Sequence, residues 1–224
     1  MRISPRRILI VVFLVFLSFI IWSILSNESS SEFTQTCNQP EKFQHDLHVM
    51  THSVHVVLEH LNITNFLCYG SLWGQLRLSR ILPWEDKTVL CILNEAVLAK
   101  DELLVARVFK SKGFIISYDS IEGIYNILQA NQKDHRKPLK VILIVFELDK
   151  VVDMYRRIGW KRRVLPPDCE TLSSLDCFPP RLIRPPLQRK EFGGKLIPVP
   201  REGIEIQKYH FRDNWWKEIT YKNC

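Results

Sequence analysis

The chain has 224 residues, of which 46% are hydrophobic and 25% are charged, and its formal net charge is +7 at pH 7. This length suits one domain with a sizeable buried core, and the composition excludes a disordered or fibrous protein. Arg2, Arg6 and Arg7 supply three of the positive charges ahead of the first apolar run, so the remainder is only mildly basic. That balance does not favour a nucleic-acid-binding protein.

The N-terminal part contains an apolar run at residues 8–25, which is just long enough to cross a bilayer as a helix. Arginines precede this run and a polar segment follows it. Because positive residues stay on the cytoplasmic side, the bulk of the chain is expected in the lumen. We therefore predict a type II single-pass protein of the Golgi or endoplasmic reticulum membrane, with a tail, a signal anchor, a stem and a lumenal domain at residues 1–7, 8–25, 26–40 and 41–224. A cleaved signal peptide is the alternative, although its apolar region normally spans about 7 to 15 residues.

The six cysteines are an even number in a chain that is expected to enter the secretory pathway, which predicts disulfides. Cys169 and Cys177 lie in one proline-rich loop and are the first pair expected. Cys91 falls within a predicted buried strand, where an inert thiol is the simplest interpretation.

A glycosylation sequon, Asn62-Ile63-Thr64, follows the first predicted helix of the lumenal part. Such sequons are modified on surface loops of lumenal proteins. Use of Asn62 would therefore support the predicted topology.

Residues 41–61 have the apolar spacing of an amphipathic helix. Its other face carries His45, His48, His52 and His55. A histidine stripe can bind a metal or sense a mildly acidic lumen. The plainer interpretation is a solvated helix face.

Residues 66–93 contain the most informative stretch of the chain. The apolar run at 66–69 predicts a strand that stops at Gly70, and Ser71 stands where the N-cap of a helix at 72–79 belongs. A second strand is predicted at 88–93. A glycine-serine turn at a helix N-terminus can hold a phosphate, because its free N–H groups and the helix dipole point to one place.

This stretch resembles the signature of the LicD and fukutin-related family, which reads Tyr-Gly-Ser/Thr-Leu-Leu-Gly-x-x-Arg, a spacer, and Pro-Trp-Asp-x-Asp-x-Asp. The residues that match are Tyr69, Gly70, Ser71, Leu72, Gly74, Arg77, Pro83 and Trp84. The resemblance implies a nucleotidyltransferase-like α/β fold with a mixed sheet. It also implies transfer of a phospho-alcohol, of the phosphocholine or ribitol phosphate type, from a cytidine-diphosphate donor to a glycan or glycoprotein.

The resemblance further implies roles for individual residues. Gly70, Ser71, Gly74 and Arg77 would bind the donor phosphates. Glu85 and Asp86 would supply catalysis and the ligands of a magnesium or manganese ion. The expected partners are therefore a glycan or glycoprotein substrate, a nucleotide-activated donor and, through the anchor, the membrane.

The acidic part of the signature departs from the family pattern. Carboxylates are expected at the first, third and fifth positions after Trp84, where this chain has Glu85, Lys87 and Val89. Side chains two apart on a strand share a face, and together they could grip one cation through oxygen ligands. A later stretch resembles the second acidic strand of the family, but Ile144 stands at its leading carboxylate. The sequence therefore predicts an impaired metal site, and both an active transferase and a non-catalytic relative that binds a glycan or a partner glycosyltransferase stay open.

The middle of the chain is expected to alternate helices and strands. Helices are predicted at 94–112 and 121–132, and strands at 114–117 and 139–148, of which the last is apolar enough for a central position. Glu147 and Asp149 are expected as rim carboxylates that pair with lysines. A basic cluster around Trp160 could grip a pyrophosphate or an acidic glycan, or could be a solvated edge; its members are Arg156, Arg157, Lys161, Arg162 and Arg163.

The C-terminal part predicts a hairpin at 188–200 that turns at Gly193 and Gly194, followed by a short helix at 204–209. This order is similar to the closing pattern of the same family. Trp215 and Trp216 are expected to pack in the core.

Overall fold

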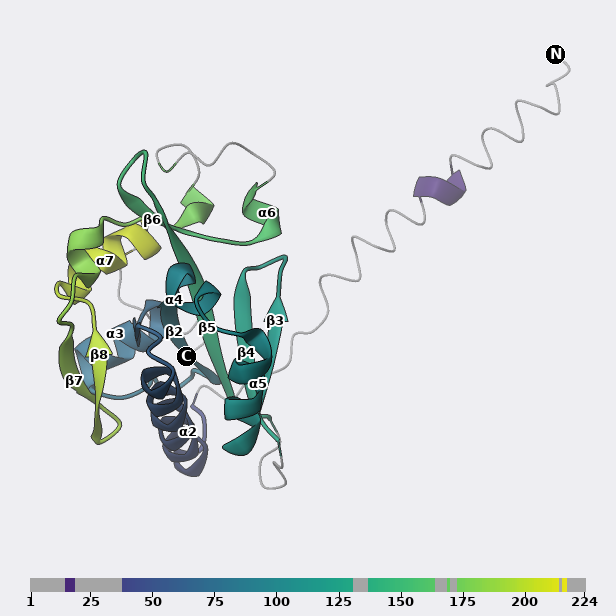
Figure 1. Ribbon diagram of the computed structural model, residues 1–224. Coiled ribbons are helices and arrows are strands. Elements are labelled where there is room, and N and C mark those ends of the chain that lie inside the picture. Colours follow the sequence, from purple (N-terminus) through teal and green to yellow (C-terminus); the bar gives the residue numbers. More distant parts are fainter. Residues whose placement is uncertain are drawn as a thin grey trace, which may run out of the picture. The chain divides into compact units, whose positions relative to one another are not determined.

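The computed structural model describes residues 15–18, 38–130, 137–163, 169, 173–213 and 215–216 (Figure 1). The chain divides into two compact units, Met1–Thr36 and Cys37–Cys224. In the first unit only residues 15–18 are described, and they are helical and exposed. No helix among the described residues is both long and apolar enough to span a membrane. Apart from residues 15–18, the predicted anchor at 8–25 lies outside the described residues, as does most of the stem.

The second unit is a mixed α/β fold built on one main sheet, as predicted. Its strand order is β1-β2-β5-β4-β3, and β6 pairs with the end of β5. Only β2 and β5 are parallel neighbours; the other pairs are antiparallel. The bounds are β1 Asn65–Leu67, β2 Lys87–Leu93, β3 Phe114–Asp119, β4 Ile124–Gln129, β5 Lys140–Asp149 and β6 Met154–Arg157.

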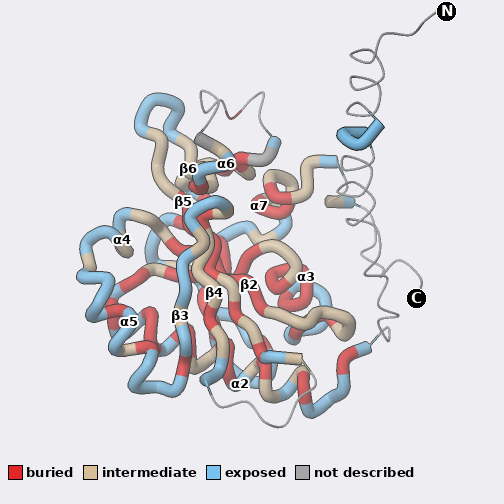
Figure 2. Tube along the Cα trace, turned by 90° about the vertical axis from the view of Figure 1, so that its right-hand side faces the viewer, coloured by how far each residue is buried: buried red, intermediate tan, exposed pale blue. Residues whose placement is uncertain are grey.

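Strand β5 has the central position that its apolar sequence predicts. It lies between β2 and β4, and Val141, Leu143 and Val145 are buried. Helices α2 (Glu41–His60) and α5 (Glu102–Ser111) pack against the sheet (Figure 2). Val141 is paired with Thr88 of β2, so these three residues of β5 share the face on which Thr88 lies. On that face Thr51 of α2 donates a hydrogen bond to the Thr88 hydroxyl of β2, with an oxygen–oxygen distance of 2.9 Å. Because side chains alternate along a strand, the neighbours of Thr88 on β2 and the residues that alternate with Val141, Leu143 and Val145 on β5 point to the opposite face of the sheet.

Several further helical elements approach that opposite face. These are α3 (Tyr69–Leu78), α6 (Trp160–Arg163), α7 (Gly203–His210) and two short 3-10 helices, η2 (Ser173–Leu175) and η3 (Pro180–Ile183). Phe178 lies between Phe66 of β1 and Phe146 of β5, with ring centroids 6.5 and 5.0 Å away. The second sheet is the predicted hairpin, β7 (Gln188–Phe192) and β8 (Lys195–Val199).

Two helix predictions were wrong in the middle of the chain. The helix predicted at 94–112 is two helices, α4 (Asn94–Leu98) and α5, because Asp101 caps α5 by accepting a hydrogen bond from the Leu103 N–H. The described part of the helix predicted at 121–132, residues 121–130, is a turn followed by β4. The Asp119 side chain accepts from the Ile121 and Glu122 N–H groups, and Gly123 has a φ of 65°, so the chain reverses there into a hairpin.

Two disulfides are formed by the described cysteines. Cys169 pairs with Cys177, as predicted. Cys91 is not an inert thiol but pairs with Cys68, the residue that directly follows β1. Cys37 and Cys224 lie outside the described residues.

The core prediction for the two C-terminal tryptophans was also wrong in part. Trp216 is 60% exposed, and Trp215 is only half-buried. The Lys208 ammonium lies 4.9 Å from the centre of the Trp215 ring, which is a cation–π contact at the surface of α7.

Candidate functional site

The signature turn, residues 68–71, joins β1 directly to α3. Helix α3 begins at Tyr69, and Cys68 is its N-cap in an extended conformation. Ser71 therefore lies inside the first helical turn and is not the N-cap that the sequence predicted. Its buried hydroxyl accepts a hydrogen bond from the Val89 N–H at 2.8 Å. Ser71 thus fastens α3 to β2, and this bond occupies the side chain that was expected to face donor phosphate.

Glu85 lies against Gly70 at the open side of the signature turn. A Cβ atom added at Gly70 would be 3.0 Å from Glu85 Oε1. Burial raises the pKa of the Glu85 carboxyl, an effect that Lys87 opposes and Asp86 reinforces. The structure therefore brings together one predicted phosphate-binding residue and one predicted catalytic residue.

The other two predicted phosphate-binding residues lie further along α3. Gly74 packs against the loop that follows the helix, and an added Cβ would be 2.4 Å from the Arg80 carbonyl oxygen. Arg77 is exposed, and its guanidinium carbon lies 4.9 Å from the centre of the Trp73 ring. Close packing of the backbone accounts for Gly74 without a ligand.

The residues at the family's metal positions do not fit a divalent cation. Lys87 and Val89 share one face of β2, and Val89 and Ile144 are 9% and 7% exposed. The Lys87 ammonium is 4.0 Å from Asp86 Oδ1. Among the described residues no group of three or more His, Cys, Asp or Glu side chains is placed to hold a metal ion. Magnesium and manganese need several oxygen ligands, which one ammonium and two aliphatic side chains do not provide.

A polar cluster that the sequence did not predict lies on the other side of Tyr69. The Tyr69 hydroxyl donates a hydrogen bond of 2.5 Å to Asp176 Oδ2, and Arg157 Nη1 lies 3.7 Å from the same oxygen. We call these three residues the Asp176 clamp. Burial and then the Asp176 carboxylate raise the pKa of Tyr69 well above its ordinary value. Burial also raises the pKa of Asp176, although Tyr69 and Arg157 oppose this.

Two residues of the clamp have a strained backbone conformation, and each is next to a disulfide bond. Tyr69 and Asp176 have φ angles of 50° and 49°, which are uncommon outside glycine and for an aromatic residue especially so. Each of them directly follows or precedes a disulfide-bonded cysteine, Cys68 or Cys177. The surrounding covalent and polar contacts therefore fix a geometry that the isolated residues would not choose.

Helix α7 closes the clamp with two further side chains. Gln207 donates a hydrogen bond of 2.7 Å to the Tyr69 carbonyl. The His210 ring stacks on the Tyr69 ring, with centroids 4.0 Å apart and an angle of 7° between the planes. Burial and the nearby Arg157 lower the pKa of His210 to about 3. Neither ring nitrogen of His210 has a hydrogen-bond partner among the described residues.

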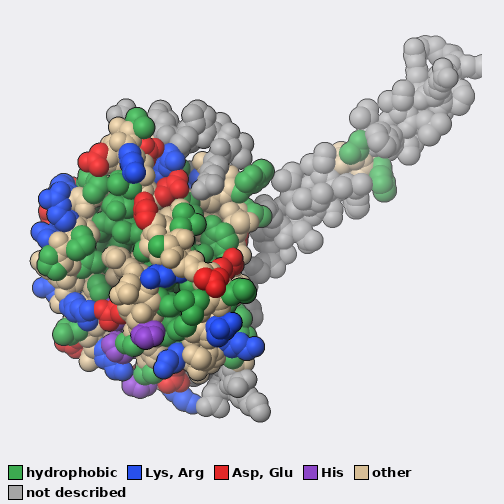
Figure 3. Space-filling model, viewed as in Figure 1, with side chains coloured by type: hydrophobic (Ala, Val, Ile, Leu, Met, Phe, Trp, Pro, Cys, Tyr) green, Lys and Arg blue, Asp and Glu red, His purple; other side chains and the backbone are tan. Residues whose placement is uncertain are grey.

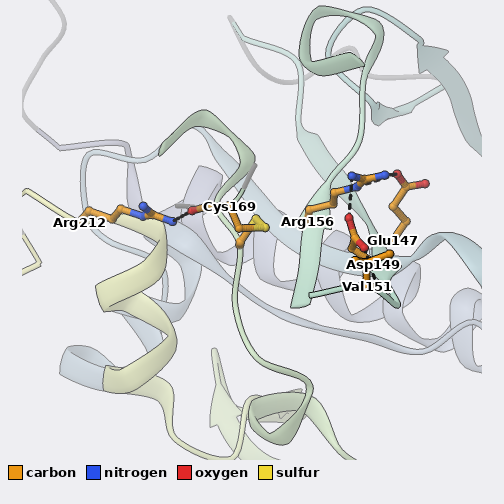
Figure 4. The surroundings of a disulfide bond; sticks show 7 residues. Glu147, Asp149, Val151, Arg156, Cys169 and Arg212 are labelled. Atoms are coloured by element: carbon orange, nitrogen blue, oxygen red, sulfur yellow. Dashed lines mark hydrogen bonds and ion pairs between the residues drawn. A yellow bond between two sulfur atoms is a disulfide. The ribbon is translucent and has the colours of Figure 1, made fainter. Parts of the chain in front are cut away.

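Most of the predicted basic cluster is engaged in internal ion pairs. Arg156 bridges Glu147 and Asp149, with nitrogen–oxygen distances of 3.0 and 2.9 Å (Figure 4). The two rim carboxylates therefore pair with an arginine and not with lysines. Glu122 holds the rest of the described members, with distances of 3.8 Å to Arg157, 3.4 Å to Lys161 and 3.2 Å to Arg162. The side chain of Arg163 lies outside the described residues.

The surface also shows basic side chains mixed with acidic ones. On the face shown in Figure 3, acidic and basic side chains are scattered among hydrophobic ones, and a few histidines gather at the lower left. No patch of one sign dominates the described part of that face. This pattern gives no support to a broad polyanion-binding surface.

The histidine stripe of α2 is partly structural. His48 Nε2 accepts a hydrogen bond from the Ile81 N–H at 2.9 Å, and burial lowers the His48 pKa to about 4. The buried His55 Nδ1 lies 2.8 Å from Asn65 Oδ1. These two residues fasten α2 to the loop after α3 and to β1, so the prediction of a solvated face was wrong for both.

Asn62 of the sequon is exposed in the turn after α2, with a φ of 54°. Its side chain is accessible, as modification would require. Glycosylation at Asn62 stays a prediction.

Comparison with known protein families identifies one match. The family model described as LicD/FKTN/FKRP, nucleotidyltransferase domain, matches residues 62–202. A search of curated proteins finds no significant match. The matched range includes the signature turn, Asp176 and Arg157, but it ends before Gln207 and His210.

Proposed function

The chain belongs to the LicD/FKTN/FKRP family of nucleotidyltransferase domains, and from this membership we propose that it is a transferase-like protein that binds a glycan without metal-dependent transfer. The family domain suggests a phosphotransferase-like role in glycan modification. What this chain would retain is the fold and the polar surroundings of Tyr69. What it would lack is the cation at the donor phosphates.

The observation that carries this proposal is the identity of three side chains. Lys87, Val89 and Ile144 stand where the family signature has carboxylates, and two of the three are buried and aliphatic. An ammonium at the first of these positions repels a cation, and no relaxation of an aliphatic side chain can supply an oxygen. At the signature positions after Trp84, Glu85 keeps its carboxylate, and Asp86 follows it.

The proposed setting follows from the N-terminal sequence. A protein anchored by residues 8–25 in the Golgi or endoplasmic reticulum membrane would present the domain to glycans in the lumen. There it would bind a glycan or a partner glycosyltransferase. Modification of Asn62 in the native protein would support this topology.

The test measures thermal stability of the full-length protein with magnesium or manganese and a cytidine-diphosphate alcohol. A ligand that binds the folded state at about one hundred times its Kd stabilises it by about 2.7 kcal/mol. We expect no metal-dependent increase in Tm for the natural chain. A metal-dependent increase, or release of cytidine monophosphate, would overturn the proposal.

Replacement of the lost acids gives the matched control. We expect Lys87→Asp with Val89→Asp to gain metal binding, because both carboxylates would share the face of β2 beside Glu85. Lys87→Asn with Val89→Asn changes the same positions without adding charge and should gain none. Equal behaviour of the two double variants would show that the positions do not face a cation site.

An active transferase without a metal is the second candidate. Lys87 favours it, because its side chain is 44% exposed and its ammonium could place a positive charge at donor phosphates. In that case donor binding would persist with a chelator present, would survive Lys87→Arg and would be lost in Lys87→Met. Absence of donor binding in the natural chain excludes this candidate.

A further inference from the structure

A groove of about 410 Å³ lies between the end of α2 and the hairpin of β7 and β8, and we call it the Asn62 groove. Its volume falls within the range of small-molecule sites, about 300–1,000 Å³. One wall carries the glycosylation sequon, and the other carries the segment that leads into β7. The lining includes Asn62, Thr64, Pro185, Pro186, Leu187 and Pro198.

The backbone at Asn62 ends helix α2. The Asn62 N–H donates a hydrogen bond of 2.8 Å to the Glu59 carbonyl. The Ile63 N–H donates a bond of the same length to the Leu58 carbonyl. Together with the φ of 54° at Asn62, these bonds form the Schellman motif, which favours glycine or asparagine at this position. The helix end therefore explains the backbone of Asn62 but makes no use of its side-chain amide.

The two acceptor side chains of the sequon are not engaged by the fold. Asn62 is exposed and Thr64 is half-buried, and neither side chain forms a hydrogen bond with another described residue. Asn65 differs, because its buried side chain donates to the Ile63 carbonyl. The Asn62 amide nitrogen is thus available for a covalent bond, and Thr64 supplies the hydroxyl that a sequon requires two residues later.

The opposite wall of the groove presents apolar groups to water. Pro185 and Pro186 are exposed, and Leu187 is half-buried. Covering such a surface is favourable, because it removes apolar area from water. Proline rings fix the backbone φ, so this wall loses little conformational freedom when a ligand covers it.

The rim of the groove has no unbalanced charge. Glu59 and Arg189 are the charged residues of the lining, and they form an ion pair with each other. An uncharged ligand with an apolar side and several hydroxyl groups suits this arrangement. N-acetylglucosamine, the first sugar of an N-linked glycan, has both features, since its acetyl methyl group and ring C–H groups are apolar.

Covalent attachment decides whether so small a contact is populated. A single free sugar on a partly apolar wall binds weakly, with a Kd on the order of 1 mM. A short tether gives its end an effective concentration in the millimolar range. A sugar attached at Asn62 therefore occupies the groove for much of the time, whereas the same sugar free in solution would not.

We propose that Asn62 carries an N-linked glycan whose first N-acetylglucosamine lies in the Asn62 groove, against Pro185, Pro186 and Leu187. In the covalent step, Asn62 Nδ2 attacks C1 of a lipid-linked oligosaccharide. An N–C bond forms, the C–O bond to the lipid diphosphate breaks, and Nδ2 loses one proton. The attached sugar then connects the end of α2 with the segment before β7 and stabilises the domain. The inference rests on the lumenal setting of the proposed function.

The first test measures occupancy of Asn62. The full-length chain is produced in eukaryotic cells with Asn27→Gln, which leaves Asn62 as the only asparagine in a sequon, and its mass is measured before and after complete enzymatic deglycosylation. We expect a glycan on this chain and on Thr64→Ser, and none on Thr64→Ala. Protease protection in sealed microsomes reports the setting separately. A protected chain without a glycan overturns the inference alone, whereas an unprotected chain overturns the proposed setting and the inference with it.

The second test measures the contribution of the first sugar to Tm. Endoglycosidase H trims a high-mannose glycan to one N-acetylglucosamine. The unmodified references are Thr64→Ala and the completely deglycosylated chain. We expect the trimmed and untrimmed forms to share one Tm, about 3 °C above both references, which is the shift of a moderate contact in a domain of this length. A trimmed form that melts with the references would overturn the inference.

Two variants connect this increment to the groove. We expect Leu187→Ala to reduce the Tm difference between trimmed and deglycosylated forms by at least about half. The matched control is Leu196→Ala on β8, since Leu196 is 57% exposed and does not line the groove. Both forms of a variant carry the same substitution, so its direct effect on stability cancels. Equal increments in the two variants contradict the inference.

A measurement on the natural side chains covers the case in which Leu187→Ala fails to fold. In the trimmed chain, NMR should detect nuclear Overhauser effects between the acetyl methyl protons of the sugar and the Leu187 methyl protons. Their absence would refute the placement of the sugar in the groove. None of these measurements involves a metal or a nucleotide donor, so their outcome is separate from that of the metal-binding test.

Discussion

Two regions meet at the signature turn, and they differ in how many polar side chains they contain. On β2 and β5 the positions expected to hold acids carry Lys87, Val89 and Ile144, and the last two belong to the hydrophobic core. On the other side of Tyr69, a phenol, a carboxylate, a guanidinium and an imidazole are packed together with strained backbone. The contrast teaches that the signature positions on the sheet are filled mostly by apolar side chains, while the polar groups are concentrated on the other side of Tyr69. Mutations can therefore address the two regions separately.

The largest expected effect tests whether the signature glycines serve packing or a ligand. Gly74→Ala would place a Cβ 2.4 Å from the Arg80 carbonyl and 3.0 Å from the Leu82 nitrogen, which are backbone atoms that cannot turn away. We expect a loss of about 3 kcal/mol in the free energy of unfolding, measured by urea titration. Gly194→Ala is the control, because it meets open space at a φ of 81° and should cost about 1 kcal/mol. Normal stability of Gly74→Ala would mean that the loop yields, and packing would not explain this glycine.

The second effect tests the Asp176 clamp. Tyr69→Phe removes the donor to Asp176 and leaves a largely buried carboxylate with only the more distant Arg157. We expect a loss of about 2 kcal/mol in the free energy of unfolding, measured by urea titration. Tyr155→Phe is the control, because no side-chain hydrogen bond joins the Tyr155 hydroxyl to another described residue, and it should cost less than about 0.5 kcal/mol. Similar values for the two variants would show that the clamp is not a stabilising contact.

The third effect is a pH dependence. The pKa of His210 is lowered from 6.5 to about 3, so the unfolded chain binds a proton in this interval that the folded chain does not. Stability is therefore fully present above about 6.5 and is lost as the pH falls toward 3. We expect His210→Phe to flatten the fall in Tm between these pH values. Parallel curves for the variant and the natural chain would contradict a buried neutral imidazole.

The smallest effect compares two members of the basic cluster. Arg156 is mostly buried and bridges two carboxylates, whereas Lys161 is 71% exposed and contacts Glu122 alone. We expect Arg156→Ala to cost about 1 kcal/mol, and Lys161→Ala to be close to neutral. Thermal unfolding at low and high salt would measure both. A larger loss for Lys161→Ala would show that the cluster is not organised by burial.

The sequence predicted the parts of the fold that short-range patterns encode. The apolar run at 139–148 became the central strand, Gly193 and Gly194 became the hairpin turn, and Cys169 paired with Cys177. The segment at 121–132 failed because Ile121, Ile124 and Leu128 have helical spacing by coincidence. The turn made by the Asp119 side chain decides the outcome there, and apolar periodicity does not report it.

The candidate site was less predictable than the fold. The metal positions could be judged from the signature, since strand alternation places them on one face. The Asp176 clamp could not, because Tyr69 and Asp176 are 107 residues apart and no motif surrounds Asp176. His210 ends a short amphipathic helix, and its burial against Tyr69, Phe146 and Phe178 depends on residues far away in the sequence.

The range that matches the family model is shorter than the range of residues that pack together in the folded domain. The family match begins at Asn62 and so omits α2, whose Leu47, Val54 and Leu58 are at most 1% exposed against the sheet. It also ends before α7, which supplies the amide that holds Tyr69. A fragment trimmed to the matched range would expose one apolar side of its sheet to water, and we expect it to aggregate. Any transplant of this domain into another protein must therefore carry both flanking helices with it.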